Sequence, residues 1–495
     1  MDRRPGRGAD PRRRLRNGRR PGAGRPGMTA RTLARWITSE LALPGEVEEA
    51  ALRHLLDGLG TAVAAARTGA ADPAVAVATR LAGPPEATIL GGTTQVSAPA
   101  AALANGTLVH ALDFDDTHAG GLVHATAVVL PAALAVGEEV GASGRRVLDA
   151  AVVGYEVACR VAAAAPHGFH ARGLHATMVA GVFSSAATAA RLYRLDADTT
   201  TQALGIAGSQ AGGLLAFLGT GASTKQLHPG FASQAGILAA RLAAAGATGP
   251  ETVFDGPHGI YDALATGDVD RSVILGGLGR TWETTRIGIK PWPACQLSHA
   301  TMAAARDALS RAGVSADAVV SVRARVHPDS AAVVCAEDRD LAHPASPYAA
   351  KFSLPWTVAA MLLDGRVDVT TYAPGQLGRR DVSELAARVA WDVVDPGAVA
   401  ADSPGDVVLT LVDGREVAGH VDRSPGGGSA PLADTDLMAK LTGNVGPLAS
   451  RLTAAVRRLP TATDLAAVLH LVAAASAPEG VRGAEPSRPI EPPEA

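Results

Sequence analysis

The chain has 495 residues, of which 47% are hydrophobic and 19% are charged, and its formal net charge at pH 7 is −3. This length predicts roughly two to three domain-sized units with a substantial core. No apolar run approaches the ~20 residues that span a bilayer, and the three cysteines lie far apart without a CxxC pair. We therefore expect a cytoplasmic protein without a membrane segment, a disulfide framework or a thiolate metal site.

The first segment, residues 1–27, holds ten arginines and two aspartates with almost nothing apolar, so it is expected to be disordered. A basic arm can bind nucleic acid, but this one has no aromatic residues and no periodic pattern. The rest of the chain carries 35 basic and 46 acidic residues. We therefore expect no nucleic-acid partner.

In chain order, residues from 29 to about 277 show apolar side chains at intervals of three and four, with glycine or proline at the breaks. This period is typical of amphipathic helices. The clearest helices are expected over 46–66, 125–141, 181–195 and 230–246.

The pattern changes in the next part of the chain. Residues 319–329 alternate apolar and polar side chains, as a half-buried strand does, and 388–395 are rich in strand-forming residues. The segment 406–421 holds an Asp-Gly pair between two such runs, which is a hairpin signal. Between these strands, 353–365 predicts a helix with Ser353 as its N-cap.

These patterns predict a mostly α protein with an inserted α+β lid. The large all-helical domain is expected from both chain ends, over 28–287 and 424–475, and the smaller α+β domain over 288–423. The proline-rich segment 476–495 is expected to be a second disordered tail.

Lysine is rare in this chain, since only four of the 45 basic residues are lysines: Lys225, Lys290, Lys351 and Lys440. A lysine that only solubilises the surface can be exchanged for arginine, whereas a site that needs a compact ammonium group cannot accept the exchange. The lysines are therefore candidates for functional positions, with chance survival as the alternative. Lys440, in a polar helix of the C-terminal segment, is expected to be solvated and replaceable.

The densest polar stretch of the helical part is NGTLVHALDFDDTHAGGLVHAT, residues 105–126. Read as a helix, it places His110, Asp113 and Thr117 on one face, and His124 opens the next helix. Asp and His are also metal ligands. Because the spacing matches neither HExxH nor an EF-hand loop, we expect no metal.

Two further segments hold candidate site residues. His170 and His175 precede a helix of small residues, although a lone histidine is more often structural than catalytic. Lys290 stands before two prolines that stiffen the backbone, with Cys295 and His299 behind it.

Five segments carry a resemblance to a known family: LVHALDFDDTH, GLHAT, STKQLHPGFASQAG, KPWPAC and AKFSLPWTVAAMLLDG. In this order they resemble the signature segments of the MmgE/PrpD family, and the similarity runs from about Thr29 to about Val472. That family contains 2-methylcitrate dehydratase, cis-aconitate decarboxylase and iminodisuccinate epimerase. The resemblance implies a large helical domain from both chain ends, a smaller α+β lid between them, and a homodimer.

By motif, the resemblance places the family's active-site positions on Asp113, Thr117, His124, His175, Lys225 and Lys290. Chance survival of the lysines is then a poor explanation, because two of them are site residues. The sequence departs from the family pattern where Gln296 stands at a position that is Arg in many relatives, and where GLHAT and VHAT have Ala in place of Pro. These departures predict a difference in substrate rather than in catalysis.

The chemistry that these residues allow starts with removal of a proton from carbon, followed by stabilisation of an enolate-like charge on the adjacent carboxylate. The two site lysines would clamp carboxylates, and one of the two site histidines would act as acid or base. Asp113 would orient an imidazole or a substrate hydroxyl, while Thr117 and His110 would bind substrate. No cofactor is needed.

The expected function is therefore that of a hydro-lyase that dehydrates a 2-methylcitrate-like or citrate-like acid, with a small di- or tricarboxylate as its ligand. Decarboxylation of cis-aconitate and epimerisation of iminodisuccinate are the alternatives within the family. A binding protein without catalysis is the alternative outside it.

Overall fold

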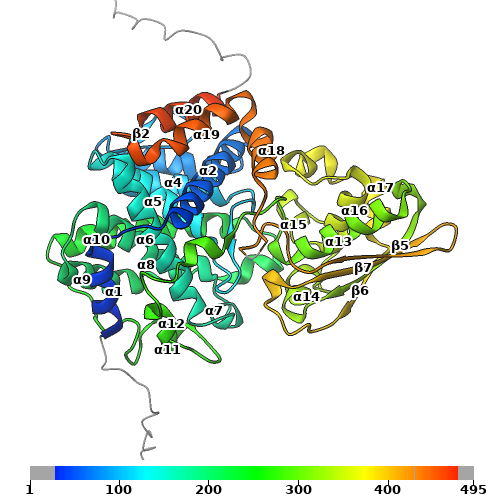
Figure 1. Ribbon diagram of the computed structural model, residues 1–495, viewed down its shortest axis with the longest axis horizontal. Coiled ribbons are helices and arrows are strands. Elements are labelled where there is room, and N and C mark those ends of the chain that lie inside the picture. The colour runs from blue at the N-terminus through cyan, green and yellow to red at the C-terminus, as the bar shows by residue number, and fades with distance from the viewer. Residues whose placement is uncertain (1–27, 429, 478–495) are drawn as a thin grey trace, which may run out of the picture.

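The computed structural model describes residues 28–428 and 430–477. Figure 1 shows two bodies side by side, a larger one made of helices and a smaller one in which helices pack on a sheet. The mostly helical fold with an α+β part is confirmed. The predicted tail at 1–27 lies outside the described residues, and so does most of the one predicted at 476–495.

The larger body is built from both ends of the described chain. Its first helices are α1 (Met28–Thr38), α2 (Gly45–Thr68), α3 (Asp72–Leu81), α4 (Ala98–His110), α5 (Ala125–Glu139), α6 (Gly144–Ala163) and α7 (Gly168–Ala171). They are followed by α8 (Ala176–Leu192), α9 (Ala197–Gly208), the 3₁₀ helix η1 (Leu215–Gly219), α10 (Thr224–Ala244), α11 (Ile260–Leu264) and α12 (Ser272–Leu275). The C-terminal part adds α18 (Asp434–Val445), α19 (Ala449–Arg457) and α20 (Ala466–Ser476).

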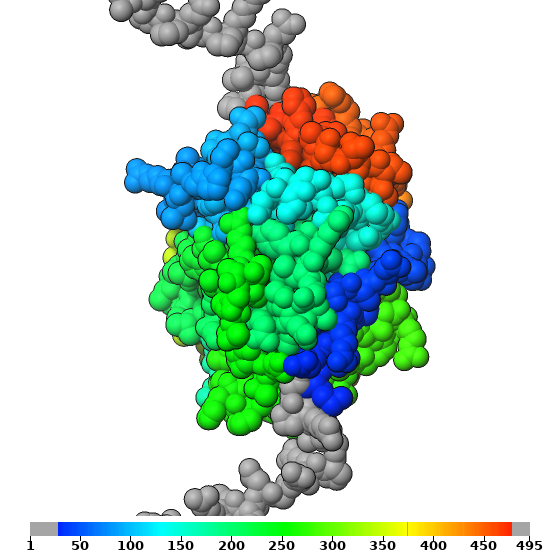
Figure 2. Space-filling view, turned by 90° about the vertical axis from the view of Figure 1, so that its left-hand side faces the viewer, coloured from blue at the N-terminus to red at the C-terminus, as the bar shows by residue number. Residues whose placement is uncertain are grey.

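Both α18 and α20 pack on α2, so the two chain ends share one core that contains Leu55, Leu441 and Val472. Figure 2 shows the orange and red C-terminal helices covering one end of this body. Two short antiparallel strand pairs complete it: β1 (Ala87–Thr88) with β2 (Gln95–Val96), and β3 (Thr117–His118) with β4 (Ile287–Gly288).

Glycine lets two helices of this body touch at the backbone. A Cβ atom on Gly106 of α4 would lie 2.7 Å from the backbone nitrogen of Gly230 on α10, and a Cβ on Gly230 would overlap the carbonyl oxygen of Leu103. Only glycine fits such a close approach. The crossing holds the C-terminal end of α4 against α10, whose first turn carries Lys225.

The smaller body contains a four-stranded sheet in the order β6-β5-β7-β8, in which only the β5–β6 pair is parallel. Its elements are α13 (Gln296–Ala312), β5 (Val319–Val326), α14 (Pro328–Val334), α15 (Pro347–Ala350), α16 (Leu354–Asp364), α17 (Arg380–Ala386), β6 (Val389–Val393), β7 (Gly405–Leu411) and β8 (Glu416–Val421). Buried residues alternate along β7, and α13 packs against β7 and β8. This body therefore has a core of its own, which includes Met302, Trp356 and Leu409.

The chain passes between the two bodies twice, and the two passages lie against each other. A Cβ atom on Gly288 would lie 2.6 Å from the Cα of Gly427, and one on Gly426 would overlap the carbonyl oxygen of Ile289. Because each body has its own core, we propose that the chain leaves the larger domain at residue 288 and returns to it at residue 424. The pairing of Thr117 with Gly288 also brings the following residues, including Lys290, to the end of β3.

Most elements agree with the sequence patterns. The helix predicted over 353–365 is α16, and the Ser353 side chain accepts a hydrogen bond from the Trp356 amide as its N-cap. The strand predicted over 319–329 ends at Val326, because Pro328 starts α14. Across the part of the chain that the structure describes, every helix is too short or too polar to cross a bilayer.

Candidate active site

The polar stretch at 105–126 does not form one helix. The helix α4 ends at His110, and a buried loop leads from there to β3. Asp113 in this loop has a left-handed backbone with φ of 52°, a conformation that is costly for residues other than glycine. The prediction that His110, Asp113 and Thr117 share one helix face is therefore wrong, because the chain leaves the helix before Asp113.

Two lysines bind Asp113 itself. The Nζ atom of Lys225 lies 2.6 Å from Oδ1 of Asp113, and that of Lys290 lies 3.2 Å from the same oxygen. Lys290 also donates to the backbone carbonyl oxygen of Asp113 at 3.0 Å. Burial opposes ionisation of Asp113, but the two ammonium groups outweigh it and hold the pKa of this carboxyl well below its usual value.

The other two lysines bind the neighbours of Asp113 in sequence. Lys351, from the α+β body, donates to the carbonyl oxygen of Leu112, and Lys440 donates to that of Phe114 at 2.7 Å. Three consecutive carbonyl oxygens outside any helix or strand thus each accept a hydrogen bond from a lysine Nζ. We infer that these bonds hold Asp113 in its left-handed conformation.

Lys440 is not the solvated lysine that the sequence pattern predicts. Its side chain is buried, pairs with Oδ1 of Asp57 at 2.6 Å and lies 4.0 Å from the ring centroid of Phe114. The prediction is wrong because α18 packs on α2, which carries Asp57. The polar residues of α18 do not by themselves show which other segment covers this helix. All four lysines of the chain are buried.

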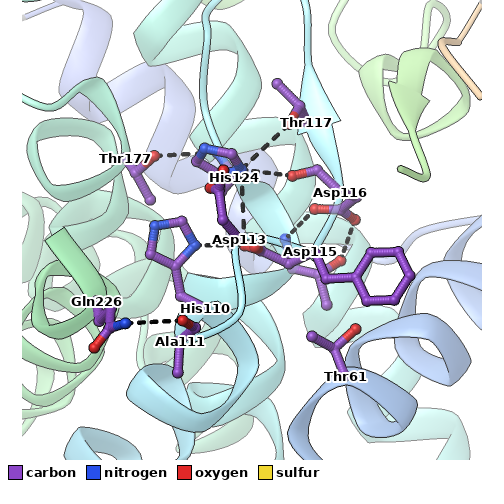
Figure 3. Close-up of polar contacts among 12 residues, drawn as sticks. Thr61, His110, Ala111, Asp113, Asp115, Asp116, Thr117, His124, Thr177 and Gln226 are labelled. Carbon is purple, nitrogen blue, oxygen red and sulfur yellow. Dashed lines mark hydrogen bonds and ion pairs between the residues drawn. The ribbon is translucent and has the colours of Figure 1, made fainter. Parts of the chain in front are cut away.

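His124 immediately precedes α5 and faces the loop. Figure 3 shows its ring next to Thr117 and Asp116. Nδ1 lies 2.8 Å from the carbonyl oxygen of Asp116 and 3.2 Å from Oγ1 of Thr117. Because a carbonyl oxygen can only accept, the neutral ring carries its proton on Nδ1, which leaves the lone pair of Nε2 for a ligand.

The second histidine, His175, precedes α8. Its Nδ1 lies 3.1 Å from Nδ1 of His228, and its ring centroid lies 5.9 Å from that of His124. Burial, together with the nearby lysine ammonium groups, lowers the pKa values of His124 and His175 well below the usual value for histidine. Burial also lowers the pKa of His170 to about 4. The site therefore holds neutral imidazoles near neutral pH.

His110 lies behind these rings, fully buried, and is not among the residues that line the cavity. Its Nδ1 pairs with Oδ2 of Asp115 at 2.8 Å, and the same oxygen lies 3.7 Å from Nδ1 of His124. The predicted contact of His110 with substrate is therefore not supported by its position. We propose instead that His110 and Asp115 orient the His124 ring.

The sequence reasoning did not single out Asp115 and Asp116. Asp116 accepts a hydrogen bond from the Thr126 amide at 3.0 Å and lies 3.3 Å from Nδ1 of His54, so it ties the loop to α5 and α2. Three carboxylates within four residues are the signal in the sequence that could have found them.

A cavity of about 320 Å³ lies between the two bodies. The structure brings six of the seven predicted site residues to its wall: Asp113, Thr117, His124, His175, Lys225 and Lys290. They come from the loop after α4, from β3, from the residues preceding α5 and α8, from α10 and from the segment after β4. These six residues therefore bring two ammonium groups, one carboxylate, one hydroxyl and two neutral imidazoles to the cavity wall.

Within residues 28–428 and 430–477, two groups of side chains have atoms close enough to share a metal ion: His110, His124 and His175, or His110 with Asp113 and Asp115. Lys225 and Lys290, which pair with Asp113, would repel a cation at this place. We propose that these groups serve acid–base chemistry rather than metal binding.

Taken together, the fold and the cavity define a mostly helical protein with an α+β part and a cavity whose ammonium groups and imidazoles suit a small carboxylate. The models of the MmgE/PrpD N-terminal domain and the MmgE/PrpD C-terminal domain match residues 31–272 and 292–460. The chain belongs to the MmgE/PrpD family.

Several curated proteins are similar to this chain. Cis-aconitate decarboxylase of Aspergillus terreus is 27% identical over 422 residues, which cover 80% of this chain and 85% of that protein. Human cis-aconitate decarboxylase is 28% identical over 397 residues, covering 77% and 80%. A cis-aconitate decarboxylase-like protein of Aspergillus oryzae is 31% identical over 282 residues, and this match spans 53% of this chain and 58% of that relative.

Proposed function

We propose that this protein is a cofactor-independent lyase that decarboxylates a cis-aconitate-like acid. The observation that carries the proposal is the pairing of Asp113 with both Lys225 and Lys290 on the wall that also holds His124 and His175. The names of the relatives point to the same reaction.

In this reaction a carbon–carbon bond breaks and carbon dioxide leaves, while the electron pair stays on the remaining acid. That charge spreads onto an adjacent carboxylate, where the ammonium groups of Lys225 and Lys290 would stabilise it. A proton must then reach the carbon. A bound carboxylate raises the pKa of a neighbouring imidazole, so the ring of His124 or His175 would be protonated in the complex and able to donate.

Dehydration of a 2-methylcitrate-like acid is the second candidate. It is favoured by the position of Thr117, whose hydroxyl lies 3.2 Å from Nδ1 of His124 on the cavity wall. A hydroxyl and an imidazole placed this way could hold a leaving hydroxyl group and supply its proton. The same cations would stabilise the enolate-like charge that forms when the carbon-bound proton is removed.

Proton NMR on the purified protein separates the candidates. It would be incubated with cis-aconitate, citrate, 2-methylcitrate or iminodisuccinate, and carbon dioxide would be measured in parallel. Carbon dioxide released with an alkene product supports the decarboxylase, whereas water loss from 2-methylcitrate supports the hydro-lyase. His124→Asn and His175→Asn serve as controls that should lose turnover. If no acid is converted, the lyase proposal is wrong and a binding protein becomes the better explanation.

A further inference from the structure

Another cavity lies in the larger body, away from the candidate active site. It has a volume of about 620 Å³, and its described lining residues all differ from those of the cavity that holds Lys225 and Lys290. Its wall comes from the end of α1, the N-terminal part of α6 and the end of α8. The helix α8, which starts directly after His175, has 17 residues and is therefore about 25 Å long. The two cavities thus lie at opposite ends of this helix.

Three arginines from two helices and a turn line this cavity: Arg146 of α6, Arg191 of α8 and Arg194 in the turn that follows α8. In the part of the chain that the structure describes, none of them forms an ion pair with a carboxylate. Positive charge therefore gathers on this wall without an acidic partner in contact.

Two acidic residues, Glu40 and Asp149, also line the cavity. Oδ1 of Asp149 already accepts hydrogen bonds from Nε and Nη2 of Arg145, at 3.0 and 2.7 Å. Glu40 follows α1 and is exposed to solvent. These carboxylates therefore do not neutralise the three arginines.

The environment of two of these arginines disfavours their charge. Burial lowers the pKa of Arg191, although the more distant Asp149 acts in the opposite direction. Burial and the positive charge of Arg194 both lower the pKa of Arg146. A bound anion would favour the charged form of both guanidinium groups.

Backbone carbonyl oxygens hold these two guanidinium groups in place. Nη2 of Arg146 donates to the carbonyl oxygen of Leu192 at 2.8 Å. Nη1 of Arg191 donates to the carbonyl oxygens of Ile37 and Ser39 at 2.6 and 2.9 Å. A guanidinium group has five N–H donors, so both side chains keep donors for a ligand.

The third side chain, that of Arg194, is exposed. Its guanidinium group has no hydrogen-bond partner within residues 28–428 and 430–477. Its backbone is left-handed, with φ of 57°, a conformation that glycine adopts at lower cost than arginine. All the donors of this third guanidinium group are therefore free for a ligand.

We propose that this cavity binds the phosphate group of a small molecule. A phosphate group carries close to two negative charges and has three terminal oxygens that do not lie in a line or in a pair, so it can accept from guanidinium groups of several segments. A carboxylate has only two oxygens and suits the fork of a single arginine. The inference does not depend on the lyase function proposed above, because binding is measured without turnover.

Calorimetric titration of the full-length protein with inorganic pyrophosphate, at constant low ionic strength, tests the inference. Arg194→Gln is expected to weaken pyrophosphate binding at least about tenfold, the loss typical of a hydrogen bond between charged groups. Arg146→Gln should weaken it similarly, and circular dichroism would show that both variants are folded. If pyrophosphate does not bind to the parent protein, the inference is wrong.

A matched control and a second probe make the test specific. Arg80→Gln removes an exposed arginine in the last turn of α3, outside this cavity, and should bind pyrophosphate as the parent does. Equal affinities of Arg194→Gln and Arg80→Gln would overturn the inference. Citrate serves as the carboxylate probe, and its binding should be the same in Arg194→Gln and in the parent. If Arg194→Gln weakens citrate as much as pyrophosphate, the cavity does not select phosphate and the inferred ligand class is refuted.

Discussion

The Nζ atom of Lys225 lies 2.6 Å from Oδ1 of Asp113, although 112 residues separate the two in sequence. The pairing places an ammonium group and a carboxylate with a strongly lowered pKa on the wall of one cavity. A compact cation fits here because Nζ also lies 4.9 Å from the ring centroid of Phe352, which limits the space around it.

Replacement of a cavity lysine by arginine should therefore reduce catalysis. Lys225→Arg and Lys290→Arg are each expected to lower kcat by about a hundredfold, because the longer, planar guanidinium shifts the charge by about 1 Å or more. Steady-state kinetics would measure the loss, and circular dichroism would show whether the variants are folded. If both folded variants turn over like the parent, the lysines have no role as carboxylate clamps.

Lys440 gives a different prediction, on stability. Lys440→Met leaves the buried carboxylate of Asp57 without its ion-pair partner, a change that typically costs about 3–5 kcal/mol. Urea denaturation should show this loss, and the double variant Lys440→Met/Asp57→Leu should recover most of it. Lys440→Arg is also expected to lower the melting temperature, because the pocket between Asp57 and Phe114 holds a compact ammonium group. A melting temperature equal to that of the parent in both single variants would contradict the assignment.

Lys351 predicts a pH dependence of folding. Burial, with opposing effects of the neighbouring charged groups Asp113, Lys290, Lys225 and Asp115, lowers the pKa of Lys351 to about 7. Between pH 7 and about 10 the unfolded chain keeps the proton that the folded chain has released, so this group makes stability rise with pH across that window. Lys351→Met should remove that part of the rise. Denaturant midpoints of both proteins at pH 7, 8, 9 and 10 would measure the difference. If stability rises with pH equally in the variant and the parent, the pKa of Lys351 is not lowered.

Chelation should leave activity intact. The side chains that could share a metal ion lie beside the ammonium groups of Lys225 and Lys290, and these repel cations. Turnover would be measured before and after dialysis against a strong chelator. Loss of activity that zinc or iron restores would show that the imidazole group does bind a metal.

The family resemblance supports a homodimer, which we propose for this protein. Phe231, Leu238 and Leu242 lie on one face of α10 and are 40%, 39% and 48% exposed, so this face is the first surface to test. In analytical ultracentrifugation the parent protein should be a dimer, and the double variant Leu238→Glu/Leu242→Glu should contain more monomer. A monomeric parent would refute the dimer, and a dimeric variant would exclude this face as its interface.

Some of the site is already contained in the composition of the chain. The rarity of lysine in a protein that otherwise uses arginine predicts Lys225 and Lys290 as site positions, and the structure buries both, together with Lys351 and Lys440, around one loop. The sequence patterns also predict α16 with its Ser353 cap and the β7–β8 hairpin, because capping, helical period and turn chemistry act within a few residues.

Other features depend on contacts between distant segments. The spacing of residues 105–117 fits a helix, yet α4 ends at His110, and lysines from three other parts of the chain bind the carbonyl oxygens that follow. The burial of Lys440 depends on the packing of α18 against α2. Local periodicity reports only which side chains share a face. Which segment covers that face, and which donor reaches an unpaired carbonyl, is decided by tertiary packing, since buried polar groups must find partners wherever the fold brings them.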